Sequence, residues 1–199
     1  RVALARALVI EPPVLLLDEP LSNLDAHLRE EMQFEICRIQ NEVGITTLMV
    51  THDQAEALSI SDRVVVMEAG RITQVDDPYR LYEHPGTPFI SDFVGKANRL
   101  RGVTGSGGQP QAAPQGPLTL SLRPEKISLG PAGSGKLSGR ISCRYFLGSQ
   151  WLYRVDTALG NLAVVRANDG SAPLDEGAPV GLDWNDALLR VLNAAEVAA

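Results

Sequence analysis

Hydrophobic positions in the first half of the chain switch between helical and strand-like spacing. Apolar residues recur every three to four positions over residues 1–10 and again over 28–43, which predicts two amphipathic helices. A Pro-Pro pair ends the first helix, while Asp25 is a suitable N-cap and Gly44 a suitable terminator for the second. The continuous apolar run at 14–18 lies between them and predicts a buried strand.

The same alternation continues to about residue 95. It predicts a layered α/β domain, because strands and helices follow one another along the chain. The further strands are expected at 46–51, 63–67 and 71–75, and the short helices at 55–58, 79–83 and 88–94.

From residue 98 onward the pattern changes to short alternating segments separated by Gly and Pro clusters. Several short strands at this spacing predict a small β-barrel or sandwich. The cluster at 105–117 is expected to be a flexible loop. The predicted fold class is therefore α/β over residues 1–95, followed by a small all-β domain over residues 96–199.

Charge supports two domains and argues against one class of partner. Residues 1–95 hold 7 Lys/Arg against 16 Asp/Glu, while residues 96–199 hold 11 against 8. Neither half has the dense basic face that a phosphate backbone requires, so nucleic acid is not an expected partner. Cys37 and Cys143 show no metal-ligand spacing, which indicates a reducing, cytoplasmic compartment.

No apolar stretch approaches the roughly 20 residues that span a bilayer, so a membrane role is expected only through a partner. The chain starts at Arg1, inside an apolar helical pattern, and we expect it to be a piece of a longer protein.

Two adjacent carboxylates, Asp18 and Glu19, follow the apolar run at 14–17. Ligands of α/β sheets bind in the crevice beyond the carboxyl ends of the strands. One carboxylate there could hold Mg²⁺ through water, and its neighbour could orient the attacking water of a nucleotide hydrolase. The alternative is a solvated Asp-Glu-Pro turn with no chemical role.

Histidine can also serve at a strand end, since its ring can donate a hydrogen bond to a phosphate oxygen. His52 follows the strand predicted at 46–51 and is placed for that role. His27 lies on a predicted helix and His84 in a connection, and both are interpreted as solvated side chains.

These motifs together resemble the ATP-binding subunits of ABC transporters. The resemblance covers VLLLDEP at 14–20 as Walker B, SNLD at 22–25 as the D-loop and TLMVTHDQAEAL at 47–58 as the H-loop region. It extends through SLRPEKISL, near residue 121, into a C-terminal regulatory domain called TOBE, which is OB-like in fold. The first domain would then be the C-terminal half of a P-loop NTPase core.

The resemblance implies roles for individual residues. Asp18 would assist Mg²⁺ binding, Glu19 would be the catalytic carboxylate, and His52 would contact the γ-phosphate of ATP. Ser22 and Asp25 would act across the interface of a head-to-tail homodimer. Gln54 and Glu56 fit the sequence after the histidine but have weaker individual claims to a role.

The resemblance also implies partners. These are transmembrane permease subunits and, indirectly, a periplasmic or surface solute-binding protein, with the ATPase peripheral at the inner face of the cell membrane. Polyamine is the favoured solute, and ferric ion, sulfate or phosphonate are alternatives.

A P-loop and a signature motif, which such an ATPase needs, are not in their expected places. GPAGSGKL at 130–137 imitates a P-loop, but Leu137 lacks the hydroxyl and a strand follows. SGGQ at 106–109 imitates the signature without a helix behind it. We therefore expect these 199 residues alone to lack ATPase activity, and to self-associate or rearrange at the N-terminus.

Two other classes of function remain open. The chain could be a noncatalytic module whose β-domain senses a ligand and mediates dimerisation. It could also belong to a non-transport ATPase of repair or translation, although the C-terminal β-domain and the missing basic surface argue against that.

Overall fold

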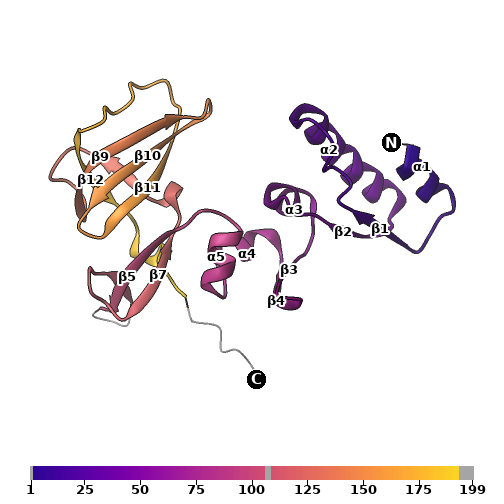
Figure 1. The fold of residues 1–199 in the computed structure, drawn as a ribbon, viewed down its shortest axis with the longest axis horizontal. Helices are drawn as coiled ribbons and strands as arrows, with labels where there is room; N and C mark the ends of the chain where they lie inside the picture. Colours follow the sequence, from indigo (N-terminus) through magenta and orange to yellow (C-terminus); the bar gives the residue numbers. More distant parts are fainter. Residues whose placement is uncertain (1, 106–108, 193–199) are drawn as a thin grey trace. The chain divides into compact units, whose positions relative to one another are not determined.

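The chain folds into two compact units in the computed structural model, residues 1–81 and residues 82–199 (Figure 1). The structure describes residues 2–105 and 109–192. The first unit mixes helices with strands and the second is dominated by strands, so the predicted fold class is confirmed.

Every helix and strand that the pattern predicts within the first unit is present, and no bound is shifted by more than two residues. Strand β1 pairs in parallel with β2, so that Leu16 lies opposite Leu48, and α2 is the crossover between them. The elements are α1 Val2–Val9, β1 Val14–Asp18, α2 Ala26–Val43, β2 Thr46–Val50, α3 Gln54–Ile60, β3 Val64–Glu68 and β4 Arg71–Asp76.

Helix α2 begins and ends where the predicted capping residues stand. The Asp25 carboxylate accepts a hydrogen bond of 2.9 Å from the Leu28 amide, and its own backbone is extended as an N-cap requires. Gly44 adopts a left-handed conformation with φ of 68° and donates its amide to the Gln40 carbonyl at 2.8 Å.

Removal of the Asp25 cap should loosen the first turn of α2. The Asp25→Ala variant is expected to lose about 1 kcal/mol of local stability, because the amide that the carboxylate satisfied then lacks its partner. The measurement is amide hydrogen exchange at Leu28, which should accelerate about fivefold. Asp25→Asn, an equally good N-cap, should leave that rate unchanged, and equal acceleration in both variants would contradict the capping role.

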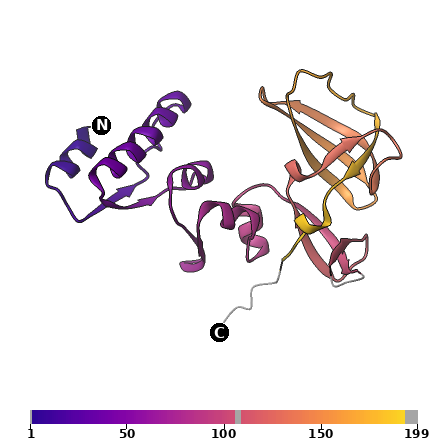
Figure 2. The ribbon, with the colours of Figure 1, turned by 180° about the vertical axis from the view of Figure 1, so that it is seen from behind.

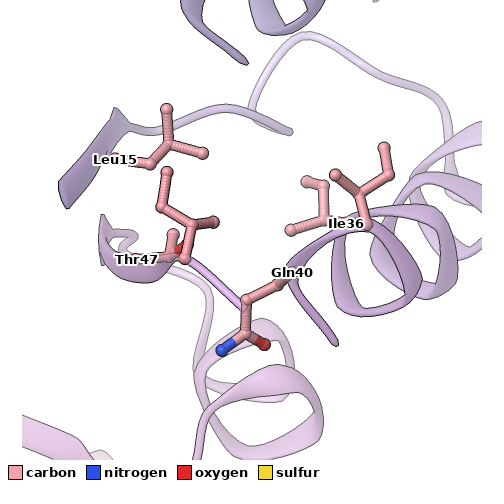
Figure 3. A pocket seen from close by; sticks show the side chains of 6 residues that line it. Leu15, Ile36, Gln40 and Thr47 are labelled. Atoms are coloured by element: carbon pink, nitrogen blue, oxygen red, sulfur yellow. The ribbon is translucent and has the colours of Figure 1, made fainter. Parts of the chain in front are cut away.

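Helix α2 covers one face of the β1–β2 pair, and both views of the chain show it running alongside these strands (Figure 1, Figure 2). Leu21, Met32 and Ile36 form a small buried core. Figure 3 shows a narrow crevice next to this core, where Leu15 and Thr47 of the strands face α2. The helix and the sheet therefore pack through apolar side chains, as the helical spacing predicts.

The opposite face of the β1–β2 pair is apolar and exposed. Val14 and Leu16 are 47% and 69% exposed, and Leu48 and Val50 are 57% and 54% exposed. These four residues are called here the open face. The self-association that we expect from such a surface stays a prediction.

Strands β3 and β4 form a separate antiparallel hairpin. The alternating pattern predicts one layered domain, whereas the structure has two sheets of two strands each in this unit. Ala69 and Gly70 connect the hairpin with φ values of 49° and 76°, the left-handed pair that a tight two-residue turn needs. This local turn pairs β3 with β4 directly.

The second unit is built from two sheets around one core. The strand orders are β11-β10-β9-β12-β8 and β13-β7-β5-β6, and the core draws on both sheets, for example on Leu120 and Tyr153. Its strands are β5 Asn98–Thr104, β6 Pro110–Ala112, β7 Leu118–Leu122, β8 Ser128–Gly130, β9 Leu137–Phe146, β10 Gln150–Thr157, β11 Gly160–Ala167, β12 Pro179–Asp183 and β13 Arg190–Val191.

A buried side chain links the two sheets. The Asn98 amide exchanges two hydrogen bonds of 2.7 Å with the backbone of Ala163, donating to its carbonyl and accepting from its N–H. These two hydrogen bonds satisfy the Asn98 side chain, which is buried next to an apolar core.

Short helices precede the β-strands. They are α4 Pro78–Glu83 and α5 Pro88–Phe93, and two 3₁₀ turns, Pro124–Lys126 and Asp186–Leu188, occur later in the chain. The buried Arg123 side chain donates to the carbonyls of Tyr82 and Ser91 at 2.8 and 3.0 Å, and to that of Gly95 at 2.5 Å. The segment from 82 to 95 is thereby attached to the β-strands that follow it.

Two glycine-rich segments have definite structure. The expectation of a flexible loop at 105–117 is wrong for 110–112, which form β6 and pair with β5. Residues 131–136 form the turn between β8 and β9, and Lys136 makes an ion pair of 2.7 Å with Asp186. The P-loop imitation is thus a connection between β8 and β9, two strands that lie on either side of β12 and both pair antiparallel with it. Of the signature imitation, residues 106–108 lie outside the described residues.

Within residues 2–105 and 109–192, no helix is both long and apolar enough to cross a bilayer.

Candidate functional site

The carboxyl ends of β1 and β2 bring the two segments of predicted chemistry together. In the parallel register Asp18 lies opposite Val50, so residues 19 and 52 both follow the last paired positions. The Glu19 amide donates to the Val50 carbonyl at 2.8 Å, which extends the pairing by one bond. The two loops therefore leave the sheet at the same edge.

Glu19 and His52 are in direct contact at this edge. His52 Nδ1 lies 3.3 Å from Glu19 Oε1, with side chains that are 73% and 48% exposed. A contact this open to water contributes little stability. The contact matters for the position of the two groups. A carboxylate and an imidazole lie side by side and face solvent, so one ligand can reach both.

Glu19 has an unusual backbone conformation. Its φ is 43°, a left-handed value that costs a non-glycine residue about 1–2 kcal/mol. The turn that follows supports it, since the Glu19 carbonyl accepts from the Ser22 hydroxyl at 3.0 Å and from the Ser22 amide at 3.3 Å. Strained backbone held by its surroundings is common at functional sites, and here it sets the direction in which Glu19 leaves the strand.

The remaining predicted residues lie around this pair in different ways. Asp18 is exposed at the end of β1, and Gln54 is exposed at the first position of α3. Asp25 uses one carboxylate oxygen to cap α2. The structure thus places Glu19, His52 and Ser22 in one connected group, with Asp18 next to it in the chain.

The donor set fits a magnesium ion only in part. Among the described residues, no three or more His, Cys, Asp or Glu side chains form a preassembled metal cluster. Mg²⁺ commonly binds one or two protein carboxylates, and phosphate oxygens and water complete its coordination. The exposed Asp18 carboxylate suits that use, because it is accessible and ends a strand.

Comparison with known proteins adds a second line of observation. Residues 120–192 match the TOBE domain family. The chain is 46% identical over 185 residues to the Fe(3+) ions import ATP-binding protein FbpC 1 of Rhizobium meliloti, covering 83% of this chain and 51% of that protein. It is 43% identical over 208 residues to the spermidine/putrescine import ATP-binding protein PotA of Rubrobacter xylanophilus, covering 93% and 55% respectively.

The chain is homologous to the ATP-binding subunits of ABC importers. It spans about half the length of the curated relatives that it matches. Among solved structures, CbiO1 of Clostridium perfringens, described as part of the ABC transporter complex CbiONQ, is 37% identical with a TM-score of 0.40, covering 42% of this chain and 33% of that one. The predicted resemblance to this family, including its TOBE domain, is confirmed.

Sequence reasoning gave Glu56 only a weak claim and missed the contacts that hold the two loops of the candidate site in place. Glu56 is 3% exposed and accepts a hydrogen bond of 2.7 Å from the Thr51 hydroxyl. Arg29 Nε lies 3.5 Å from Glu56 Oε1, and Arg29 Nη1 lies 3.6 Å from Asp53 Oδ2. Thr51 and Asp53 are the two neighbours of His52 in the sequence.

One local signal could have pointed to Glu56. Asp53 and Glu56 stand three residues apart at the start of a helix, the spacing of a capping box. Asp53 does cap α3, accepting from the Ala55 and Glu56 amides at 2.8 and 3.2 Å. Arg29 carries no comparable signal, since its acidic partners are 24 to 27 positions later in the chain.

Proposed function

We propose that this chain forms the carboxylate and histidine part of the ATP-hydrolysing site in an ABC importer subunit. The observation that supports this most is the Glu19–His52 contact at the carboxyl ends of two parallel strands, on an exposed edge. It combines with the homology to ATP-binding subunits of importers.

Each residue has a defined task in this proposal. ATP with Mg²⁺ supplies the reacting γ-phosphate and the charge that neutralises its oxygens. Asp18 offers a carboxylate oxygen toward the metal, and Glu19 orients the attacking water and accepts its proton. His52 donates to the γ-phosphate from the neighbouring strand.

Three further residues have supporting tasks. Ser22 holds the turn after Glu19 and, with Asp25, faces the partner subunit of a homodimer. Gln54 has the weakest claim, as an exposed residue beside His52.

The proposed setting is the cytoplasmic face of a membrane. The subunit would dock on transmembrane permease subunits that a solute-binding protein supplies, and residues 1–95 and 96–199 would be its nucleotide-binding part and its TOBE-like regulatory part. Polyamine and ferric ion are the proposed solutes, since the relatives named for both are 43% and 46% identical to this chain. Uptake of radiolabelled spermidine and of radiolabelled ferric iron by cells with and without the gene distinguishes them.

Hydrolysis is tested on two polypeptides. The 199 residues alone are expected to turn over no Mg-ATP, because the phosphate cradle that Asp18 and Glu19 serve must come from other residues. The polypeptide encoded by the whole reading frame around the chain is expected to hydrolyse Mg-ATP. Phosphate release from the 199 residues that is lost in Glu19→Gln would contradict the first expectation, and no release from the longer polypeptide would contradict the proposed function.

A second candidate function is a noncatalytic sensing and dimerisation module. The observation in its favour is the TOBE match over residues 120–192, which have their own core. Calorimetric titration of the 199 residues with spermidine and with oxyanions tests this alternative. It would be favoured if one of these ligands gave heat of binding while the longer polypeptide showed no ATPase activity.

A further inference from the structure

A polar cluster lies directly behind the candidate site in the first unit. Thr51 and Asp53 flank His52, Glu56 lies in the first turn of α3, and Arg29 lies in the first turn of α2. We name these four residues the clamp. Sequence analysis gave Glu56 only a weak claim and the other three no individual role. Arg29 and Glu56 lie in two helices that start at different loops of the site.

Glu56 is the buried centre of the clamp. A carboxylate with a side chain only 4% exposed is costly unless its charge is compensated. The Thr51 hydroxyl compensates one oxygen with a hydrogen bond of 2.7 Å, and the Arg29 guanidinium lies 3.5 Å from the other. An apolar side chain of similar volume at this position would often give equal or higher stability. The contribution to stability therefore does not explain why a carboxylate is buried here.

The clamp fixes the segment that presents His52. The Thr51 hydroxyl donates to Glu56 and also accepts a hydrogen bond of 3.0 Å from the Asp53 amide. The Asp53 carboxylate in turn caps α3. The residues before and after His52 are therefore both anchored, while the imidazole itself stays exposed.

Arg29 connects this segment with the other loop of the site. Its Nη2 donates to the Leu24 carbonyl at 3.0 Å, within the D-loop at residues 22–25. Its Nη1 and Nε point toward Asp53 and Glu56. One planar guanidinium thus touches both loops, which a lysine with its single point charge cannot do.

We infer that Arg29 and Glu56 are positioning residues that keep the His52 segment and the D-loop in a fixed relation, so that a movement of one loop is passed to the other. The inference rests on the proposed function for its effect on catalysis. Its structural part stands on the contacts within residues 24–56 and is testable without any activity.

The first test measures amide exchange in the 199-residue chain. Glu56→Leu removes the anchor of Thr51, so exchange at the Asp53 amide is expected to rise about tenfold, the effect of losing one hydrogen bond to a charged group. The Leu28 amide, held by Asp25, serves as an internal reference and should keep its rate. Glu30→Gln, on the exposed side of α2, is the matched control variant.

A double variant separates positioning from stability. Arg29→Met with Glu56→Leu replaces a buried ion pair by apolar side chains, which commonly restores stability. We expect the unfolding midpoint to recover while Asp53 exchange stays about tenfold raised, because Thr51 still lacks its acceptor. If the unfolding midpoint and the Asp53 exchange rate both returned to their values in the unmodified chain, the role of the pair would be purely structural and the inference would be overturned.

Kinetics of the longer polypeptide complete the test. Glu56→Leu is expected to lower kcat for ATP hydrolysis about tenfold to a hundredfold with KM nearly unchanged, because misplacement of His52 affects the reacting phosphate more than nucleotide binding. An unchanged kcat overturns the inference. Absence of hydrolysis in the unmodified polypeptide counts against the proposed function, and the exchange result then still decides the clamp.

Discussion

Glu19→Gln in the longer polypeptide is expected to slow ATP hydrolysis about a thousandfold and to leave ATP binding nearly unchanged. Glutamine keeps the size and the hydrogen-bonding oxygen of the side chain but cannot accept a proton, and loss of a general base commonly costs a factor of 10²–10⁴. The effect should fall on kcat, because the carboxylate acts on the attacking water and not on the bound nucleotide.

The measurement pairs phosphate release with equilibrium binding of a labelled nucleotide. Glu30→Gln makes the same chemical change at an exposed position of α2 and should retain full activity. A Glu19→Gln protein that hydrolyses ATP within a fewfold of the unmodified one would refute the assignment of Glu19. Loss of binding in the same variant would instead indicate a role in holding the nucleotide.

Arg123→Met is expected to destabilise the second unit by about 3 kcal/mol, in the range found when one partner of a buried charged network is removed. The Arg123 side chain is buried, donates to three backbone carbonyls and lies over the Tyr82 ring at 4.0 Å. Burial lowers the pKa of the Arg123 guanidinium from its ordinary value. The group still stays charged, because the ordinary pKa of arginine is far above neutrality. Methionine fills the space of the stem but leaves the three carbonyls without their donor.

Tryptophan fluorescence isolates this effect, because the only two tryptophans, Trp151 and Trp184, both belong to the second unit. The midpoint of urea unfolding should fall while its slope is unchanged. Arg154→Met, at an exposed arginine of β10, is the matched control and should change the midpoint little. Equal midpoints for Arg123→Met and the unmodified chain would show that the carbonyls find other donors.

Apolar periodicity and capping residues predicted the helices and strands well where interactions between residues close in sequence decide where an element begins and ends. Helix α2 starts after Asp25 and stops at Gly44 because each residue satisfies an end of the helix by itself. Which strands pair with which was harder to predict. Strands β3 and β4 form a sheet of their own, and residues 110–112 pair with β5, because apolar spacing does not encode the partner of a strand.

The candidate site divides in a similar way. Motif spacing placed Glu19 and His52 at neighbouring strand ends, and the structure brings them to 3.3 Å. Their proposed roles in catalysis remain predictions. Glu56 had only a weak claim from its place after the histidine, and Arg29 had none. An arginine and a glutamate on two helices look like ordinary surface residues until the fold buries one against the other.

The open face has a consequence for how the site comes to order. Strand β1 carries Asp18 and Glu19 at its end and exposes Val14 and Leu16 along its length. Whatever covers those apolar side chains also stiffens the strand on which the two acids sit. Covering the face and ordering the acids are then thermodynamically linked, so each should strengthen the other. A nucleotide that binds at the two acids would then also favour an ordered β1. An apolar partner surface that covers the open face would in the same way favour the ordered positions of Asp18 and Glu19.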